Sequence, residues 1–450
     1  IMNRIYRLIV LVIILITLTN CRDFLSEKSD VKLAIPETIE DNQALLDQHG
    51  FINIDFSSIA ETSSDDIYLN DSDYNSLPYD EYKRLYTWQP DNVTPPVSVG
   101  NAWMHCYRAI YICNSVLKNI NDYNLTGIDA DNVKGQALAL RAIRYLDGVQ
   151  AWCKAYNSAT AGNDLGLPLK LDPDMNAPST RSSLQDTYAQ IIADLKSAID
   201  LLPEKQISVT RMSKTAAQGI LARTYLYMGD YENSLKYSLE SLKRNSKLLN
   251  YNQLNQQADF PINDLNEEIL FWGAMKYDYH LIPAKIPLSL FNRYSDNDLR
   301  KNIFFRTNAS GEILFKGYYL NSNGPLCGIA VDEIFLMAAE SYIRKGNIVE
   351  GLAKLNELSE KRWKIGTFIP FSASTQEDAL EIVLTERRKE LILRGLRWAD
   401  IKRLNLQGKN IVLNRNVNGQ SYILQPNDLK YAIAIPEDII KLTGMQQNPR

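Results

Sequence analysis

Aromatic rings are mixed with acids and amides in two stretches of the chain, residues 65–88 and 277–294. The flat C–H faces of a sugar stack on aromatic rings, and its hydroxyl groups suit carboxylates and amides. Peptides use the same groups, so both ligand classes stay open. A single ring is more often part of a core, but both stretches lack the periodicity that burial imposes. The sequence therefore predicts ligand-binding residues there: Asp66, Tyr74, Tyr79, Trp88, Tyr277, Tyr279 and Tyr294.

Motifs of common enzyme classes are absent from the sequence. There is no phosphate-binding P-loop, no G-x-G-x-x-G, no H-E-x-x-H and no C-x-x-C. The three histidines, His49, His105 and His280, stand far apart, which disfavours a metal site or a triad. Ser115-x-x-Lys118 and residues 295–297 match two penicillin-binding motifs, but no K-T-G follows them. The sequence predicts no catalytic residue, no metal and no cofactor.

Acid pairs leave one enzymatic alternative open. A glycoside hydrolase needs two carboxylates at a defined separation across a cleft. Acid pairs such as Asp65-Asp66, Glu267-Glu268 and Glu377-Asp378 are present, but the sequence does not fix their separation. Solvated surface acids are the simpler interpretation. We therefore expect a non-catalytic protein, with a secreted glycoside hydrolase as the alternative.

Composition and charge limit the possible partners. Of 450 residues, 45% are apolar, 10% aromatic and 23% charged, which are values of a globular protein. The 49 basic and 53 acidic residues give a net charge of −4, without the positive excess that a phosphate backbone requires. Nucleic acid is therefore excluded as an expected partner.

The N-terminus has the pattern of a bacterial lipoprotein signal. Arg4 and Arg7 precede an apolar run at 8–18, which is too short to span a bilayer core of ~30 Å but fits the apolar region of a secretory signal. The next residues, 18–21, resemble a lipobox, in which cleavage precedes a cysteine whose thiol is acylated. Residues 1–20 are thus expected to be removed, and acyl chains on Cys21 would supply any membrane attachment.

Helical periodicity dominates from residue 101 onward. Apolar residues at steps of three and four predict helices at 101–122, 131–154 and 182–202, the last ended by Pro203. A repeat follows, in which Ala222-x2-Tyr225-x3-Gly229 recurs as Ala339-x2-Tyr342-x3-Gly346. Alanine lets two helices approach, tyrosine fills the groove and glycine ends the first helix in a left-handed cap. This pattern resembles the tetratricopeptide (TPR) hairpin.

Strand signals are few: 269–275, 313–319, and a hairpin with strands at 410–413 and 422–424 around Asn418-Gly419. The predicted fold is mainly α, with interrupted TPR-like helical hairpins forming a scaffold and an irregular, loop-rich half containing a few short strands. We expect a signal peptide at 1–20 and one unit at 21–450. Its parts are an irregular region at 22–100, TPR-like helices at 101–245, a loop and strand insertion at 246–330, and TPR-like and C-terminal helices with the hairpin at 331–450.

The densest charged segment lies at 386–403. On a helix, Glu386 and Glu390 share a face and Glu390 reaches Arg394, while Gly395 can break the helix. An anion site is one interpretation. Because the basic residues have matched acids nearby, the sequence favours an ion-pair network that holds the C-terminal helices to the scaffold.

Segment 386–403 closely resembles the C-terminal hallmark of the SusD/RagB family of surface lipoproteins, E-R-x-x-E-L-x-x-E-G-x-R-x-x-D-I-x-R, with Arg394 in place of a glutamate. The resemblance extends over nearly the whole chain. Its other parts are Cys21 to Leu25, Trp103, Tyr107, Asn114, Arg141-Ala142, 166–169, 214–231, Ile435-Pro436 and Asn448-Pro449.

The resemblance implies a lipid-anchored binding protein at the cell surface, on the outer membrane of a Gram-negative bacterium. Such proteins cap a SusC-like TonB-dependent transporter and deliver oligosaccharides, or in some members peptides, to it. It also implies that the TPR side supports the transporter contact and that ligands bind in the irregular half. The alternatives are a peptide-binding member, a glycoside hydrolase and a TPR adaptor.

Overall fold

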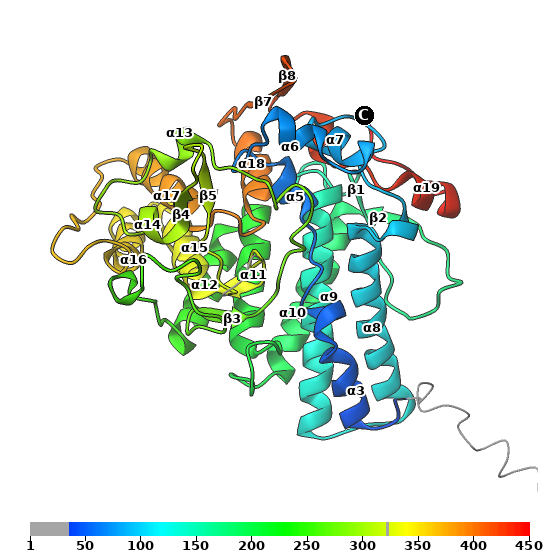
Figure 1. Cartoon of the computed structure of the whole chain (residues 1–450). Coiled ribbons are helices and arrows are strands. Elements are labelled where there is room, and N and C mark those ends of the chain that lie inside the picture. The colour runs from blue at the N-terminus through cyan, green and yellow to red at the C-terminus, as the bar shows by residue number, and fades with distance from the viewer. Residues whose placement is uncertain (1–35, 321–323) are drawn as a thin grey trace, which may run out of the picture.

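Antiparallel helices build the scaffold of the computed structural model, which describes residues 36–320 and 324–450 (Figure 1). The expected signal peptide and Cys21 lie outside the described residues. Each long helix packs on the next in the order α8, α9, α10, α11, α12, α15, α16 and α17. The mainly α scaffold predicted from the sequence is confirmed. Its helices are α8 (Ala102–Asp122), α9 (Ile128–Trp152), α10 (Leu184–Leu201), α11 (Lys214–Met228), α12 (Tyr231–Arg244), α15 (Val331–Arg344), α16 (Ile348–Glu360), α17 (Gln376–Glu390) and α18 (Arg397–Leu406).

The two predicted repeats are both helix–turn–helix hairpins. Gly229 ends α11 with φ +76°, and Gly346 stands between α15 and α16 with φ +87°. Both angles lie in the left-handed region, where a side chain would be strained. In the first repeat Tyr225 stacks on Tyr237, with ring centroids 5.8 Å apart. The glycine caps proposed from the sequence are therefore confirmed.

Short elements fill the space between residues 36 and 100, where the sequence predicts irregular structure. One or two helical turns are too short to give a clear hydrophobic period, which explains why the sequence does not reveal them. These helices are α3 (Ile39–Leu46), α4 (His49–Ile52), α5 (Ile59–Ser63), α6 (Asp71–Asn75), α7 (Asp80–Tyr86) and the 3₁₀ turn η2 (Val97–Val99). Others of this kind are η3 (Tyr251–Gln253), α13 (Leu288–Phe291), α14 (Arg300–Phe304), η4 (Leu429–Tyr431) and α19 (Glu437–Thr443).

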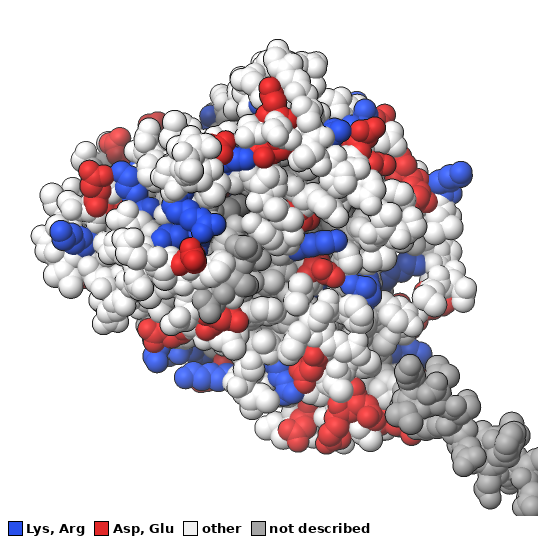
Figure 2. All heavy atoms as spheres, in the orientation of Figure 1, with Lys and Arg blue, Asp and Glu red and all other residues white. Residues whose placement is uncertain are grey.

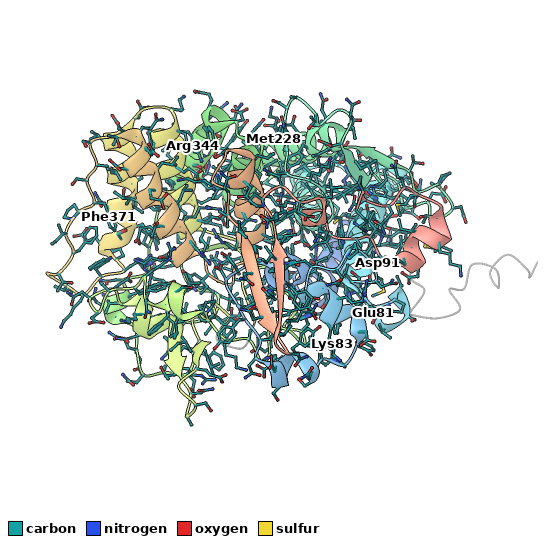
Figure 3. All side chains as sticks on the ribbon, turned by 90° about the horizontal axis from the view of Figure 1, so that it is seen from above. Glu81, Lys83, Asp91, Met228, Arg344 and Phe371 are labelled. Carbon is teal, nitrogen blue, oxygen red and sulfur yellow. The ribbon has the colours of Figure 1, made fainter. Side chains whose placement is uncertain are left out.

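Each strand of the described chain has one antiparallel partner. The strands predicted at 269–275 and 313–319 exist but end earlier, and the predicted hairpin turns at Asn418-Gly419, where both residues have positive φ. Seen from above, this hairpin lies between Phe371 on one side and Glu81 and Asp91 on the other (Figure 3). The pairs are β1 (Leu165–Pro168) with β2 (Arg181–Ser183), β3 (Ile269–Phe271) with β6 (Ile329–Ala330), β4 (Phe305–Thr307) with β5 (Ile313–Phe315), and β7 (Leu413–Val417) with β8 (Gln420–Leu424).

Two large apolar clusters stabilise the fold. One runs through the helical scaffold and includes Trp152 and Trp398. The other lies mainly in the insertion, around Tyr251 and Phe304, and reaches the residues that follow α17. The insertion therefore carries much of its own core.

The charged segment at 386–403 forms a buried ion-pair network, as the sequence predicts. Glu390 is central, with its carboxylate oxygens 2.7 Å from Arg362 Nε and 2.9 Å from Arg300 Nη1. Arg362 also donates to Glu268 at 2.7 Å, and Arg300 donates to Glu386. The partners of Glu390 thus come from the insertion and the end of the second repeat.

One ion pair predicted for this segment, between Glu390 and Arg394, does not form. Glu390 does not pair with Arg394, because the helix has ended and Leu393 and Gly395 both have positive φ. Arg394 turns to the start of α15, where its Nη1 lies 3.0 Å from Asp332. A carboxylate from another helix thus compensates for the arginine that stands where the family pattern has glutamate.

The same segment pairs with the region before the scaffold and with the second repeat. Arg388 and Arg397 lie 3.0 and 2.7 Å from Asp65 in the loop after α5. Arg403 lies 2.6 Å from Glu340 of α15. Segments far apart in the chain are therefore held together by α17 and α18.

Candidate functional site

Three tyrosines from two distant segments form a cluster at the surface, which we call the tyrosine cluster. The ring centroids of Tyr79 and Tyr82 are 5.5 Å apart, and those of Tyr82 and Tyr279 are 5.6 Å apart. Tyr79 is 38% exposed and Tyr279 is 49% exposed. Two of the residues nominated from the sequence are thus brought together, one from each stretch.

Local structure explains why these rings meet. Tyr79 directly precedes α7 and Tyr82 lies in its first turn, three positions later, which brings the two rings together. The loop that carries Tyr279 is tied down at Lys285, whose backbone exchanges hydrogen bonds of 2.8 and 3.0 Å with Tyr68. Inside the cluster, buried His280 packs on Tyr82 at 5.0 Å and bonds its carbonyl oxygen through Nε2 at 2.9 Å.

A small cleft with a few polar groups adjoins the tyrosine cluster. It is lined by Tyr82, Lys276, Asp278 and His105, among others, and holds about 30 Å³, enough for a single water or hydroxyl group. Burial alone would raise the pKa of Asp278, but hydrogen bonds and attraction from His280, with a hydrogen bond from Ser58, lower it. Asp278 is therefore an ionised acceptor at neutral pH, close to the exposed rings.

Three nominated residues lie in the interior, and this corrects their assignment as exposed ligand groups. Trp88 is 6% exposed, and its indole N–H donates to Ser63 O at 3.0 Å. Tyr294 is 1% exposed and donates to Lys389 O at 2.8 Å. Asp66 is buried beside Arg388, at 3.0 Å. Long-range partners hold all three, and such partners are invisible in local sequence spacing.

The remaining nominated residues are partly buried. Tyr74 packs near Tyr86, with ring centroids 5.9 Å apart, and Tyr277 packs near Tyr318 at the same separation. Burial, as the leading cause, raises the pKa of both phenols. Neither ring belongs to the tyrosine cluster.

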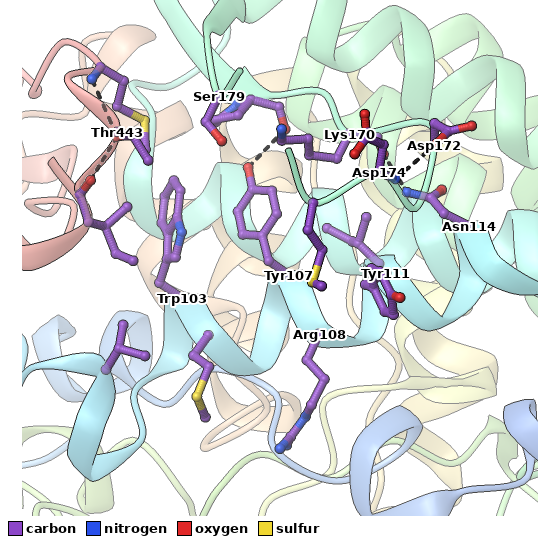
Figure 4. Close-up of a pocket in the computed structure, with 17 residues that line it drawn as sticks. Trp103, Tyr107, Arg108, Tyr111, Asn114, Lys170, Asp172, Asp174, Ser179 and Thr443 are labelled. Carbon is purple, nitrogen blue, oxygen red and sulfur yellow. Dashed lines mark hydrogen bonds between the residues drawn. The ribbon is translucent and has the colours of Figure 1, made fainter. Parts of the chain in front are cut away.

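A larger pocket lies against α8, and we call it the α8 pocket (Figure 4). Its volume is about 500 Å³. Trp103, Tyr107 and Tyr111 line it in succession along the helix, and the first two stack with centroids 4.7 Å apart. The signal was present in the sequence, because aromatic residues four apart form a stripe on one helical face. Sequence reasoning missed it as a site.

Residues 36–320 and 324–450 hold neither a metal-binding cluster nor a membrane-spanning helix. No group of three or more His, Cys, Asp or Glu side chains there could hold a metal ion. No helix in the same ranges combines the length and apolar character needed to cross a membrane.

Acidic and basic side chains are interspersed over the face drawn in Figure 2.

The fold places this chain among proteins built from TPR-like helical pairs that a loop-rich insertion interrupts. A family model described as "Starch-binding associating with outer membrane" matches residues 23–226, and a model of the SusD family matches 331–442. The chain belongs to the SusD/RagB family.

Similar proteins agree in fold and extent. SusD-like protein P2 of Formosa agariphila is 24% identical over 422 residues, covering 78% of this chain and 80% of its own. A SusD superfamily structure from Bacteroides thetaiotaomicron has a TM-score of 0.73 at 20% identity, covering 92% of this chain and 100% of its own. A SusD-like carbohydrate binding protein from Bacteroides vulgatus has a TM-score of 0.69 at 22% identity, with coverages of 90% and 96%.

Proposed function

We propose that this protein binds a glycan at the tyrosine cluster, without catalysis, and delivers it to a partner TonB-dependent transporter. The observation that carries the proposal is the meeting of exposed Tyr79 and Tyr279 through Tyr82, beside the ionised Asp278. Rings offer stacking faces to a sugar, and the carboxylate accepts hydrogen bonds from its hydroxyl groups. The matched description of starch binding and the carbohydrate-binding relative support a glycan as the ligand.

The first test is titration calorimetry against a panel of soluble polysaccharides and peptides. For the glycan that binds, replacing both Tyr79 and Tyr279 by Ala should weaken binding roughly tenfold or more, by analogy with base stacking worth ~1–3 kcal/mol per ring. The fold should be little affected because both side chains are partly exposed and neither belongs to an apolar core cluster.

Tyr123→Ala is the matched control, since Tyr123 is also 39% exposed but lies just beyond the far end of α8. It should bind as wild type. Equal binding by all variants would contradict the site, and binding of peptides alone would contradict the glycan. Release of shorter sugars from the panel would contradict a non-catalytic role.

The proposed location is the outer membrane surface, with attachment through Cys21. The matched family description names the outer membrane, and the lipobox-like sequence supplies the acylation site. Cys21→Ala should move the protein from the outer-membrane fraction to the soluble fraction, because no acyl chain remains.

Fractionation and mass spectrometry of the N-terminal peptide check this prediction, and affinity capture of the wild-type protein should retain a TonB-dependent barrel. An unmodified Cys21 in membrane-bound protein would contradict attachment through a lipid anchor. Membrane retention of the variant would point to attachment through the partner.

A further inference from the structure

The α8 pocket is built from elements other than those of the tyrosine cluster. One wall is α8, a second is the loop at 169–180 between β1 and β2, and a third is α19 with the residues after it. The loop is fixed to the helices at its base, where Asn114 and Tyr145 donate to Lys170 O at 2.8 and 2.7 Å. The pocket is thus a formed part of the fold.

Its interior is mainly apolar, and several of the polar groups that line it are already paired. Tyr107 O–H donates to Pro168 O at 3.0 Å, Asn114 donates to Lys170 O, and Thr443 O–H donates to Ile439 O at 2.7 Å. The rest of the inner surface is mainly aromatic rings and the thioethers of Met104 and Met445, which adapt to irregular apolar groups. Such an interior suits a hydrocarbon or aromatic group better than sugar hydroxyls.

The apolar character continues outside the cavity. Tyr111 is 42% exposed and Met175 is 81% exposed at the mouth, and Val99, Leu171 and Leu442 are exposed next to lining residues. Exposed apolar side chains gathered around a pocket mark a surface for association, and we call these five residues the apolar rim. A molecule that only filled the cavity would leave the rim in water, so the occupant is larger than the cavity.

The mouth also carries negative charge. Asp172 and Asp174 line it, and within the described residues neither carboxylate forms an ion pair. They accept hydrogen bonds from backbone N–H groups of their own loop, at 2.9 and 2.8 Å. The ammonium of Lys170 donates to the carbonyls of Ala177 and Pro178 instead.

We infer that the α8 pocket docks a polypeptide segment of a partner protein, which inserts an aromatic or aliphatic side chain and places a lysine or arginine against Asp172 and Asp174. The apolar rim packs on the residues that flank the inserted side chain. This inference stands apart from glycan binding, because it uses none of the residues of the tyrosine cluster.

Three fluorescein-labelled heptapeptides test the inference by fluorescence anisotropy. One has a Leu-Trp-Leu centre flanked by lysines, the second has the same centre flanked by glutamates, and the third has a serine centre flanked by lysines. The first should bind roughly tenfold more tightly than the second, as complementary charge predicts, and the third should not bind.

Variants locate the binding. Tyr111→Ala combined with Met175→Ala removes exposed walls and should weaken the first peptide roughly tenfold. Asp172→Asn with Asp174→Asn should remove most of the preference for lysine over glutamate. Ser179→Trp, which fills the pocket, should abolish binding, with circular dichroism to confirm that it is folded. Tyr79→Ala with Tyr279→Ala should leave peptide binding unchanged.

Three outcomes would overturn the inference. They are the absence of binding by the first peptide, equal binding of lysine and glutamate peptides, and equal affinity of free tryptophanamide and the first peptide, which would indicate a small-molecule site. Glycan binding and peptide binding are tested with separate variants, so the loss of one can be measured without the loss of the other.

Discussion

Glu390→Ala should lower the free energy of unfolding by roughly 3–5 kcal/mol, the cost of removing one partner from a buried ion pair. The carboxylate is inaccessible to solvent and accepts from both Arg300 and Arg362, whose side chains are also buried. Asp298, Glu386 and Glu268 still face these arginines. The substitution therefore removes some ion pairs of the network and leaves others, and denaturant unfolding measures the change in free energy.

A glutamate on the same helix provides the control. Glu381 pairs with Lys409 at 2.8 Å, but its side chain is mostly exposed. Exposed pairs contribute about 0–1 kcal/mol, so Glu381→Ala should change the unfolding free energy by less than ~1 kcal/mol. Similar losses in the two variants would show that the network contributes no more than surface pairs. Glycan affinity of folded Glu390→Ala protein should match wild type.

Glu61→Gln should stabilise the protein at pH 8 and have little effect at pH 5. Glu61 is buried in α5, where loss of hydration, followed by repulsion from Asp66, raises the pKa of its carboxyl to about 8. Its Oε2 accepts the backbone N–H of Gly395 at 2.8 Å, a contact that the carbonyl of glutamine can reproduce.

The sign follows from proton counting. Between the ordinary glutamate pKa of 4.5 and about 8, the folded protein keeps a proton on Glu61 that the unfolded chain releases. The contribution of Glu61 to the free energy of unfolding is therefore at its full value below pH 4.5 and declines as pH rises toward 8. Glutamine does not titrate, so its advantage over wild type should grow with pH by up to ~1.4 kcal/mol per unit.

Unfolding of both proteins at pH 5, 6, 7 and 8 measures the difference. Exposed Glu360, at the end of α16, gives the control substitution, Glu360→Gln, for which the difference from wild type should stay constant. A constant difference for Glu61→Gln as well would mean that Glu61 is ionised in the folded protein throughout this range.

Long periodic elements were predictable from the sequence because their pattern reports burial directly. Helices α8, α9 and α10 lie within a few residues of their predicted ranges, and Asn418-Gly419 turns the hairpin as its left-handed preference requires. The helices of region 36–100 were not predictable. They are one or two turns long, and contacts with distant segments position them.

The candidate site was predictable only in part, for a related reason. Tyr79 and Tyr279 meet through Tyr82. Trp88 and Tyr294 are equally irregular in spacing, but each is buried in an apolar cluster, where its polar atom donates to a distant backbone carbonyl. Composition indicates which residues can bind a ligand. Whether such a side chain is exposed depends on its packing and hydrogen bonds with distant segments of the chain. The partner of Arg394 was unpredictable on the same grounds, since Asp332 lies 62 residues away.

The ion-pair network has a consequence for the synthesis of the chain. A ribosome makes α17 and α18 late, yet they supply the countercharges of Asp65 near the start, Arg300 in the insertion and Glu340 in the second repeat. A chain that ends before residue 376 would leave Asp65 without its two arginine partners and would leave Arg300 and Glu340 with fewer partners, which is costly where the charges are buried. Only a chain that includes α17 and α18 closes the network, so these helices act as a check that chains terminated earlier fail.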